Sequence, residues 1–286
     1  MSLLKIYIFL YLFGFLVPQK TTHPVLKNIQ TPVSISHQGG NLVYPDQSML
    51  AFKNSVDLGV QVLELDIHRS LDSIIVIHHD ETIERLTNKN GLIKEMTWNE
   101  LQEADGAYNW TIDGENYPYR GEGIKILSLT QLIDMYPDKI YDIEIKQSDP
   151  PIENDLCDIL RNYELASDRV VVASYYDYII NRFHDVCPEV AISLSVNKGT
   201  KLYILSRVGL ENLLPINAVV AQLPLQFSTL FGDLKLDKRY INAFSKGDRQ
   251  VWVWTVNDST KMEKVFEIGA HGILTDRPDI LMNVID

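Results

Sequence analysis

Positive charge is scarce in this chain. It has 26 Lys and Arg residues against 38 Asp and Glu residues, which gives a formal net charge of -12 over 286 residues. A nucleic-acid-binding protein needs a basic surface that faces the phosphates, and basic clusters also draw proteins to anionic lipid headgroups. The composition therefore predicts no nucleic-acid partner. A substrate that contains phosphate would have to meet positive charge locally, at a bound cation or a single lysine.

Cysteine is almost absent. The chain has two, Cys157 and Cys187, too few for a disulfide framework. Cys157 falls in a helix-like stretch and Cys187 precedes a proline, so neither lies at a strand end beside a base. The sequence therefore does not predict a catalytic thiol.

Long apolar runs are missing except at the N-terminus. Lys5 is followed by an apolar and aromatic run from Ile6 to Val17, which Pro18 ends. This pattern is typical of the first two regions of a signal peptide, and it is short for a membrane span of about 20 residues. No small-x-small cleavage site follows. We expect residues 1–20 to be an export signal or an uncleaved anchor, and the protein to be periplasmic, extracellular or associated with a membrane through this segment.

The remaining chain alternates between strand-like and helix-like segments. Residues 21–31 are expected to form a linker and residues 32–286 one domain, because α/β barrels of about 250 residues are commonly a single unit. Eight strands alternating with helices predict an α/β fold, a (β/α)8 TIM barrel. The expected strands cover residues 33–37, 62–67, 140–146, 170–174, 191–195, 218–223, 251–256 and 272–275.

One region breaks the alternation. Only six residues, from His68 to Ser73, separate Ile67 from Ile74, too few for a helical crossover, so residues 74–79 are expected to be the return arm of a hairpin. Residues from about 80 to 125 are rich in glycine and aromatics and contain capping-box spacing at Thr97 and Glu100. We expect them to form an inserted cap segment at the barrel mouth.

Paired polar residues mark two of the expected strands. Side chains alternate along a strand, so Glu64 and Asp66 share one face, as do Glu144 and Lys146. Two neighbouring carboxylates in a low-dielectric setting repel unless they are paired or metal-bound, and a divalent cation with oxygen ligands resolves the repulsion. A solvated edge strand shows the same alternation, and for either strand alone it is the simpler interpretation.

Two histidines close expected strands. His37 precedes Gly39 and Gly40, and His79 precedes Asp80. A single histidine at a strand end is more often a structural residue. Two of them beside three acids and a lysine favour proton-transfer chemistry, for which imidazole is well suited near neutral pH.

Taken in order, these residues resemble the glycerophosphodiester phosphodiesterase family, a branch of the phosphatidylinositol-phospholipase-C-like barrel enzymes. The resemblance runs from about Ser34 to the C-terminus. The family's opening His-Arg-Gly is similar to His37-Gln38-Gly39, and its Glu-x-Asp, His-Asp and Glu-x-Lys motifs are similar to Glu64-Leu65-Asp66, His79-Asp80 and Glu144-Ile145-Lys146. The segments from Trp254 to Asn257 and from Gly272 to Pro278 are also similar to family signatures.

The resemblance implies metal-dependent hydrolysis of glycerophosphodiesters to an alcohol and glycerol 3-phosphate. One divalent cation, Ca²⁺ or Mg²⁺, is expected on Glu64, Asp66 and Glu144. The expected acid–base pair is His37 and His79, with neither role assigned, and the expected substrate-binding residues are Gln38, Lys146 and Trp254. Trp254 could equally be a core aromatic.

The family's arginine is replaced by Gln38, and a neutral amide cannot form the bidentate charged contact of a guanidinium with phosphate. This departure leaves the substrate open. One alternative is a lysophospholipase D-type enzyme that acts on a lysophospholipid. Another is a non-catalytic ligand-binding barrel, against which the complete set of acids, histidines and lysine argues. The sequence predicts no oligomeric state.

Overall fold

The structure, a computed structural model, describes residues 4–5, 23–229 and 232–286. The apolar run from Ile6 to Val17 therefore lies outside the described residues. Within the described part of the chain, no helix has the length and apolar character needed to cross a membrane.

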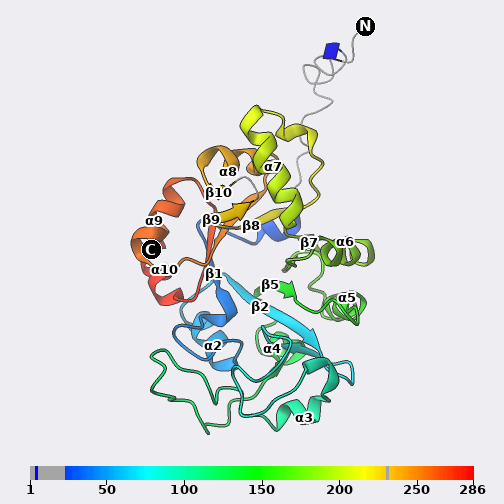
Figure 1. The fold of residues 1–286 in the computed structure, drawn as a ribbon, viewed down its shortest axis with the longest axis vertical. Coiled ribbons are helices and arrows are strands. Elements are labelled where there is room, and N and C mark those ends of the chain that lie inside the picture. The colour runs from blue at the N-terminus through cyan, green and yellow to red at the C-terminus, as the bar shows by residue number, and fades with distance from the viewer. Residues whose placement is uncertain (1–3, 6–22, 230–231) are drawn as a thin grey trace.

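A nearly closed parallel barrel forms the centre of the molecule (Figure 1). Its strands follow the order β7-β6-β5-β2-β1-β12-β11-β8, and β7 and β8 meet at a single parallel bridge between Ser193 and Val220. The TIM-like α/β fold is thus confirmed. The barrel strands are β1 (Val33–Ser36), β2 (Val62–Arg69), β5 (Ile140–Ile145), β6 (Val170–Ala173), β7 (Ala191–Ile192), β8 (Val220–Pro224), β11 (Gln250–Trp254) and β12 (Gly272–Thr275).

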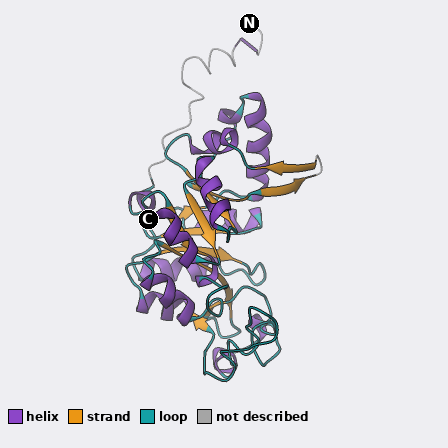
Figure 2. Cartoon of the chain, turned by 90° about the vertical axis from the view of Figure 1, so that its left-hand side faces the viewer, coloured by secondary structure: helices purple, strands orange, loops and turns teal. Residues whose placement is uncertain are grey.

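Helices surround the barrel (Figures 1 and 2). They are α2 (Met49–Asp57), α4 (Leu129–Met135), α5 (Glu153–Asn162), α6 (Asp177–Val186), α7 (Val196–Val208), α8 (Lys238–Ser245), α9 (Ser259–Glu267) and α10 (Pro278–Ile285). A short 3-10 helix, η4 (Glu211–Leu213), follows α7, and an antiparallel pair, β9 (Gln226–Thr229) and β10 (Gly232–Lys235), projects after β8 (Figure 2). The sequence did not predict this hairpin or α10.

The predicted hairpin after β2 is present. β3 (Ile75–Ile77) runs antiparallel to β2 with Ile67 opposite Ile77, and β4 (Leu127–Ser128) pairs with β3. Between β3 and β4 lie η3 (Ile93–Glu95) and α3 (Trp98–Gln102), whose N-terminus carries the predicted capping box of Thr97 and Glu100. A separate small apolar cluster holds this insertion together; it includes Val76, Ile83, Ile93 and Leu101.

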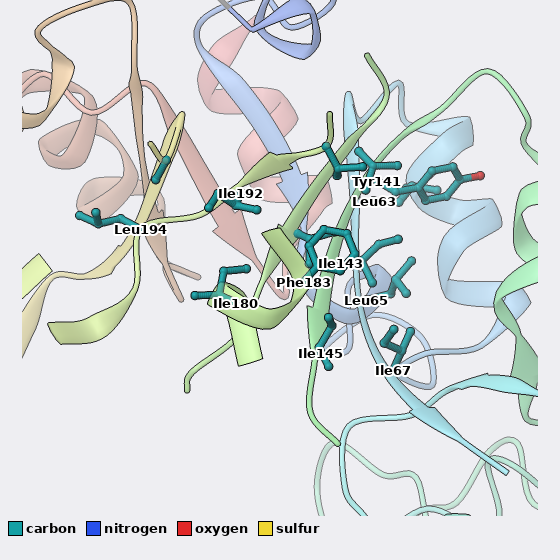
Figure 3. Close-up of a cluster of buried hydrophobic side chains, with 14 of the residues drawn as sticks. Leu63, Leu65, Ile67, Tyr141, Ile143, Ile145, Ile180, Phe183, Ile192 and Leu194 are labelled. Carbon is teal, nitrogen blue, oxygen red and sulfur yellow. The ribbon is translucent and has the colours of Figure 1, made fainter. Parts of the chain in front are cut away.

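Side chains on the barrel strands point alternately outward and inward, and they form two separate apolar cores. The outward side chains of β2 and β5, among them Leu65, Ile67 and Ile143, pack with Phe183 of α6 in one continuous core (Figure 3). The inward side chains near the amino ends of the strands form a second core, with Val33, Val62, Trp252 and Leu274. Further along the same inward face of β2 the chain places Glu64 and Asp66.

The segment before β1 closes the amino end of the barrel. Val25, in η1 (Pro24–Lys27), is fully buried and Ile29 is 6% exposed, and both belong to the inner core. The His23 ring bonds the carbonyl of Glu189 and the Asn28 amide donates to the carbonyl of Asp168, both at 3.0 Å. The described part of the expected linker, from His23 onward, is therefore folded against the barrel.

The two cysteines form a disulfide, which the sequence analysis did not predict. Cys157 lies in α5 and Cys187 directly follows α6, and their Cα atoms are 5.8 Å apart. These neighbouring helices bring together residues that are 30 positions apart in the chain. The bond therefore ties two successive βα units.

Candidate active site

Two neighbouring strands present the acids. In the parallel pairing of β2 with β5, Glu64 lies beside Asp142 and Asp66 beside Glu144. Oxygen atoms of Glu64, Asp66 and Glu144 lie within 4.8 Å of one another. Glu64 and Asp66 are almost fully buried, so charge repulsion among these groups is weakly screened. Burial, and then the negative charge of Asp66, raise the pKa of Glu64 well above its ordinary value.

Lys146 supplies the positive charge at this cluster. Its Nζ lies 2.8 Å from Glu144 Oε2 and 3.1 Å from Asp66 Oδ1. Burial acts to lower the pKa of Lys146, but attraction to Asp66 and Glu144 outweighs burial and raises it. The lysine therefore stays protonated, as a fixed cation beside the acids.

Asp66 is held from its other side by two amides. Gln38 Nε2 donates to Asp66 Oδ2 at 3.1 Å and Gln47 Nε2 donates to the same oxygen at 2.6 Å. Gln38 has φ of 53° and its backbone N–H donates to Glu64 Oε2 at 2.7 Å. Gln38 is 5% exposed and its side chain is bonded to Asp66; its contact with substrate stays a prediction.

The loop after β1 holds His37 in place. Gly39, at φ +78°, packs so closely on α2 that a Cβ there would lie 2.9 Å from the Cβ of Ala51. His37 Nδ1 bonds Asp276 Oδ1 at 2.6 Å, and Asn257 Nδ2 donates to Asp276 Oδ2 at 2.7 Å. Burial lowers the pKa of His37, but Glu64, Asp276 and Asp66 outweigh it and raise the pKa to about 9.

His79 approaches from the hairpin. Its Nδ1 bonds Asp80 Oδ1 at 2.8 Å, and its side chain is 41% exposed. The hydrogen bond from His79, and then the contact with Arg85, lower the pKa of Asp80 despite its partial burial. Asp80 therefore stays ionised, and it can orient the imidazole ring.

These groups share one cleft of about 570 Å³. His37, Glu64, His79, Glu144 and Lys146 line it, together with Trp254. Trp254 is 41% exposed, in contrast to the fully buried Trp252 on the same strand. Asp66 and Gln38 are not among the lining residues, but Asp66 contacts Lys146, which lines the cleft, and Gln38 donates to Asp66.

Sequence reasoning missed several buried polar residues beside the site. His68 continues the inward face of β2, and burial lowers its pKa to about 4. Asp142 continues the inward face of β5; burial raises its pKa to about 8, although Gln222 donates to both of its oxygens at 2.7 and 2.9 Å. The two-residue period could have found His68 and Asp142. Asp276 lies in the segment from Gly272 to Pro278 that the family resemblance had marked, without an assigned role. Nothing local could have found Gln222, which reaches the site from β8.

The family comparison agrees with this geometry. A model of the Glycerophosphoryl diester phosphodiesterase family matches residues 37–280. The chain belongs to this family. Its predicted enzyme class, a phosphoric diester hydrolase, is confirmed with it.

Curated relatives carry two kinds of name. A Glycerophosphodiester phosphodiesterase of Caldanaerobacter subterraneus is 27% identical over 258 residues, 88% of this chain and 96% of that protein. The human Lysophospholipase D GDPD1 is 23% identical over 269 residues, 88% of this chain and 85% of that protein.

Solved structures share the fold. The phosphodiesterase domain of a Mycobacterium tuberculosis protein superimposes with a TM-score of 0.78 at 20% identity, covering 90% of this chain and 100% of that one. A phosphodiesterase from Oleispira antarctica, solved in complex with the product sn-glycerol-3-phosphate, gives a TM-score of 0.70 at 18% identity, covering 90% of this chain and 97% of that one.

Proposed function

We propose that this family member hydrolyses glycerophosphodiesters to an alcohol and glycerol 3-phosphate, with the help of one divalent cation. The observation that carries the proposal is the convergence of three carboxylates, a lysine and two histidines on one cleft. A barrel that only binds ligands would gain nothing from burying so many like charges together. Family membership supports the same reaction.

The donor set fits a hard divalent cation. Glu64, Asp66 and Glu144 offer oxygen atoms that lie close enough together to bind a single ion, and Ca²⁺ and Mg²⁺ both prefer oxygen ligands. Burial, and then the negative charge of Asp66, raise the pKa of Glu64, and a bound cation would offset the repulsion between these carboxylates. When bound, such an ion supplies Lewis-acid polarisation of a phosphoryl oxygen.

The chain's own residues then provide charge and protons. Lys146, fixed at the edge of the acid cluster, stabilises negative charge on the phosphoryl oxygens. His37 and His79 reach the cleft from different elements and are oriented by Asp276 and Asp80. In-line displacement at phosphorus needs one group that accepts a proton and one that donates it. We assign these steps to the two histidines.

Chelation tests the proposal. Excess EDTA should abolish release of glycerol 3-phosphate from glycerophosphocholine and lower the melting temperature, and Ca²⁺ or Mg²⁺ should restore both. Glu144→Gln should remove most of the metal-induced rise in melting temperature. The matched control is Glu263→Gln on the exposed face of α9, which should leave that rise intact. Full turnover in excess chelator would refute the metal-dependent reaction.

We also propose that the protein is exported or held at a membrane by its N-terminal segment. Two features support this: the apolar run from Ile6 to Val17 and the Cys157–Cys187 disulfide. Disulfides persist in oxidising compartments and are rare where thiols are kept reduced.

A further inference from the structure

The cleft has a charged side and an apolar side. Its ionisable groups come from β1, β2, β5 and the β3 hairpin. The opposite wall comes from the ends of β6, β7, β8, β11 and β12 and has no charged side chain in the described part of the chain. Its apolar and aromatic residues are Ala173, Tyr175, Tyr176, Leu194, Val196, Trp254 and Leu274, and its polar residues are Ser174, Ser193, Gln222 and Thr255. A phosphodiester held at the acids would therefore direct one of its substituents over an apolar surface.

The aromatic side chains in the outer part of this wall are unusually exposed to solvent. Tyr175 is 65% exposed, Tyr176 47% and Trp254 41%; we call these three residues the aromatic rim. The tyrosine rings pack edge-on with centroids 5.4 Å apart, and Tyr176 lies 5.5 Å from the ring of Tyr178, which is itself 49% exposed. Large aromatic surfaces left in water are available for apolar contacts with a ligand.

Charge restricts what can lie on the rim. Among the described residues that line the cleft, Lys146 is the one permanent cation, and it is already engaged by Glu144 and Asp66. The apolar wall carries no cation to meet a second anionic group. A tyrosine has an apolar ring and a polar tip, which suits the boundary between a hydrocarbon chain and water.

We propose that the phosphodiester taken by this cleft carries a hydrocarbon chain, and that the aromatic rim covers this chain and determines specificity for it. The inference rests on the proposed phosphodiesterase function and extends its substrates to lysophospholipid-type diesters, from which cleavage of the same bond releases an alcohol and an acylated glycerol 3-phosphate. The tyrosines bind the chain, while the acids and histidines act on the phosphate.

A chain-length series tests the proposal. kcat/KM would be measured for glycerophosphocholine and for lysophosphatidylcholines of increasing acyl length, all below their micellar concentrations. Because the headgroup is constant, the series reports the chain alone. Wild-type kcat/KM should rise with length, by up to about fourfold for each methylene that the rim covers.

Substitutions in the aromatic rim then test whether its residues cause the dependence on chain length. Tyr175→Ser combined with Tyr176→Ser should lower the ratio of lysophosphatidylcholine to glycerophosphocholine turnover at least tenfold, mainly through KM. Replacing both tyrosines by Phe should keep the ratio. Met135→Ser is the control, because Met135 is equally exposed, at 57%, but lies at the end of α4, just before the amino end of β5.

The outcomes distinguish the rim proposal from the proposed phosphodiesterase function. Good turnover of glycerophosphocholine with no dependence on chain length would overturn the rim proposal and leave the phosphodiesterase function standing. Equal losses on both substrates in the Ser variant would also overturn it, because the rim would then serve the headgroup or the cleft in general. A wild-type enzyme that hydrolyses none of these diesters would overturn the proposed function and this inference with it.

Discussion

At the scale of single residues, two adjacent histidines have different surroundings, so one is expected to act in catalysis and the other to stabilise the fold. His78 is 2% exposed and its Nδ1 bonds the carbonyl of Asp80 at 3.0 Å, whereas His79 lines the cleft. Both residues directly follow β3, and the chain there buries His78 and places His79 in the cleft.

Substitution of each histidine should therefore have a different consequence. His79→Ala should lower kcat by about 10² to 10⁴ with little change in melting temperature, because it removes a proton-transfer group from an exposed position. His78→Ala should lower the melting temperature while kcat changes by less than tenfold. Thermal melts and initial rates on glycerophosphocholine distinguish them. An essential His78 beside a dispensable His79 would contradict the register of β3.

The residues that sequence could predict are those whose position depends on strand periodicity alone. Glu64, Asp66 and Glu144 meet because two parallel strands each place alternate residues inward. The partners of Asp66 could not be predicted in the same way. Gln47 comes from the turn before α2. The role of Gln38 as a donor to Asp66 depends on a left-handed backbone conformation, which no local sequence pattern predicts.

At the scale of elements, the barrel is closed unevenly. β2 and β5 pair over six consecutive residues, whereas β7 contributes two residues and meets β8 at one bridge. The sequence predicted a strand over residues 191–195, but Ser195 is already the N-cap of α7. α7 begins at Val196, where β-branched and glycine residues in the first turns weaken the helical pattern.

Residues 23–31, which the sequence predicted to be part of a linker, close the amino end of the barrel and are called its floor here. Its apolar residues, Pro24 to Leu26 and Ile29, are too few to indicate a helix or strand. In the structure Val25 and Ile29 fill the amino end of the barrel, and burying each such side chain contributes about 1.5 to 3 kcal/mol.

Two truncations test this role. Removal of residues 1–22 should leave a folded, active enzyme, because the floor is retained. Removal of residues 1–30 should lower the melting temperature by on the order of 10 °C, since each kcal/mol corresponds to roughly 2 to 4 °C in a domain of this size. In the shorter truncation, Val25→Ala should be destabilising and Lys27→Ala, at an exposed position, should not. Equal melting temperatures for the two truncations would show that the floor contributes nothing.

At the scale of the whole molecule, buried ionisable groups couple stability to pH. Burial lowers the pKa of four histidines: His23, His68, His78 and His271. Burial raises the pKa of Glu64 and Asp142. The two sets act in opposite directions, because a raised carboxyl pKa gives stability at low pH that is lost as pH rises, whereas the lowered histidine pKa values give stability that is lost as pH falls.

His271 isolates the histidine contribution, because it lies before β12, at the amino end of the barrel and away from the acids. Its Nδ1 accepts a hydrogen bond from the backbone N–H of Val251 at 3.2 Å, which requires the unprotonated nitrogen. Burial lowers the pKa of His271 below its ordinary value of 6.5. The unfolded chain therefore binds the proton first as the pH falls, and stability present above pH 6.5 is lost below it.

His271→Asn should flatten this dependence. The Asn side-chain oxygen can accept the same hydrogen bond from Val251 but does not titrate, so the variant should melt close to the wild type at pH 7.5. Between pH 6.5 and 5 the wild type should lose melting temperature faster than the variant, and the two curves should converge or cross. Thermal melts at half-unit pH intervals and fixed ionic strength measure the difference. Parallel curves over that interval would mean that His271 titrates alike in the folded and unfolded chains, and that the acid sensitivity arises at the other buried histidines.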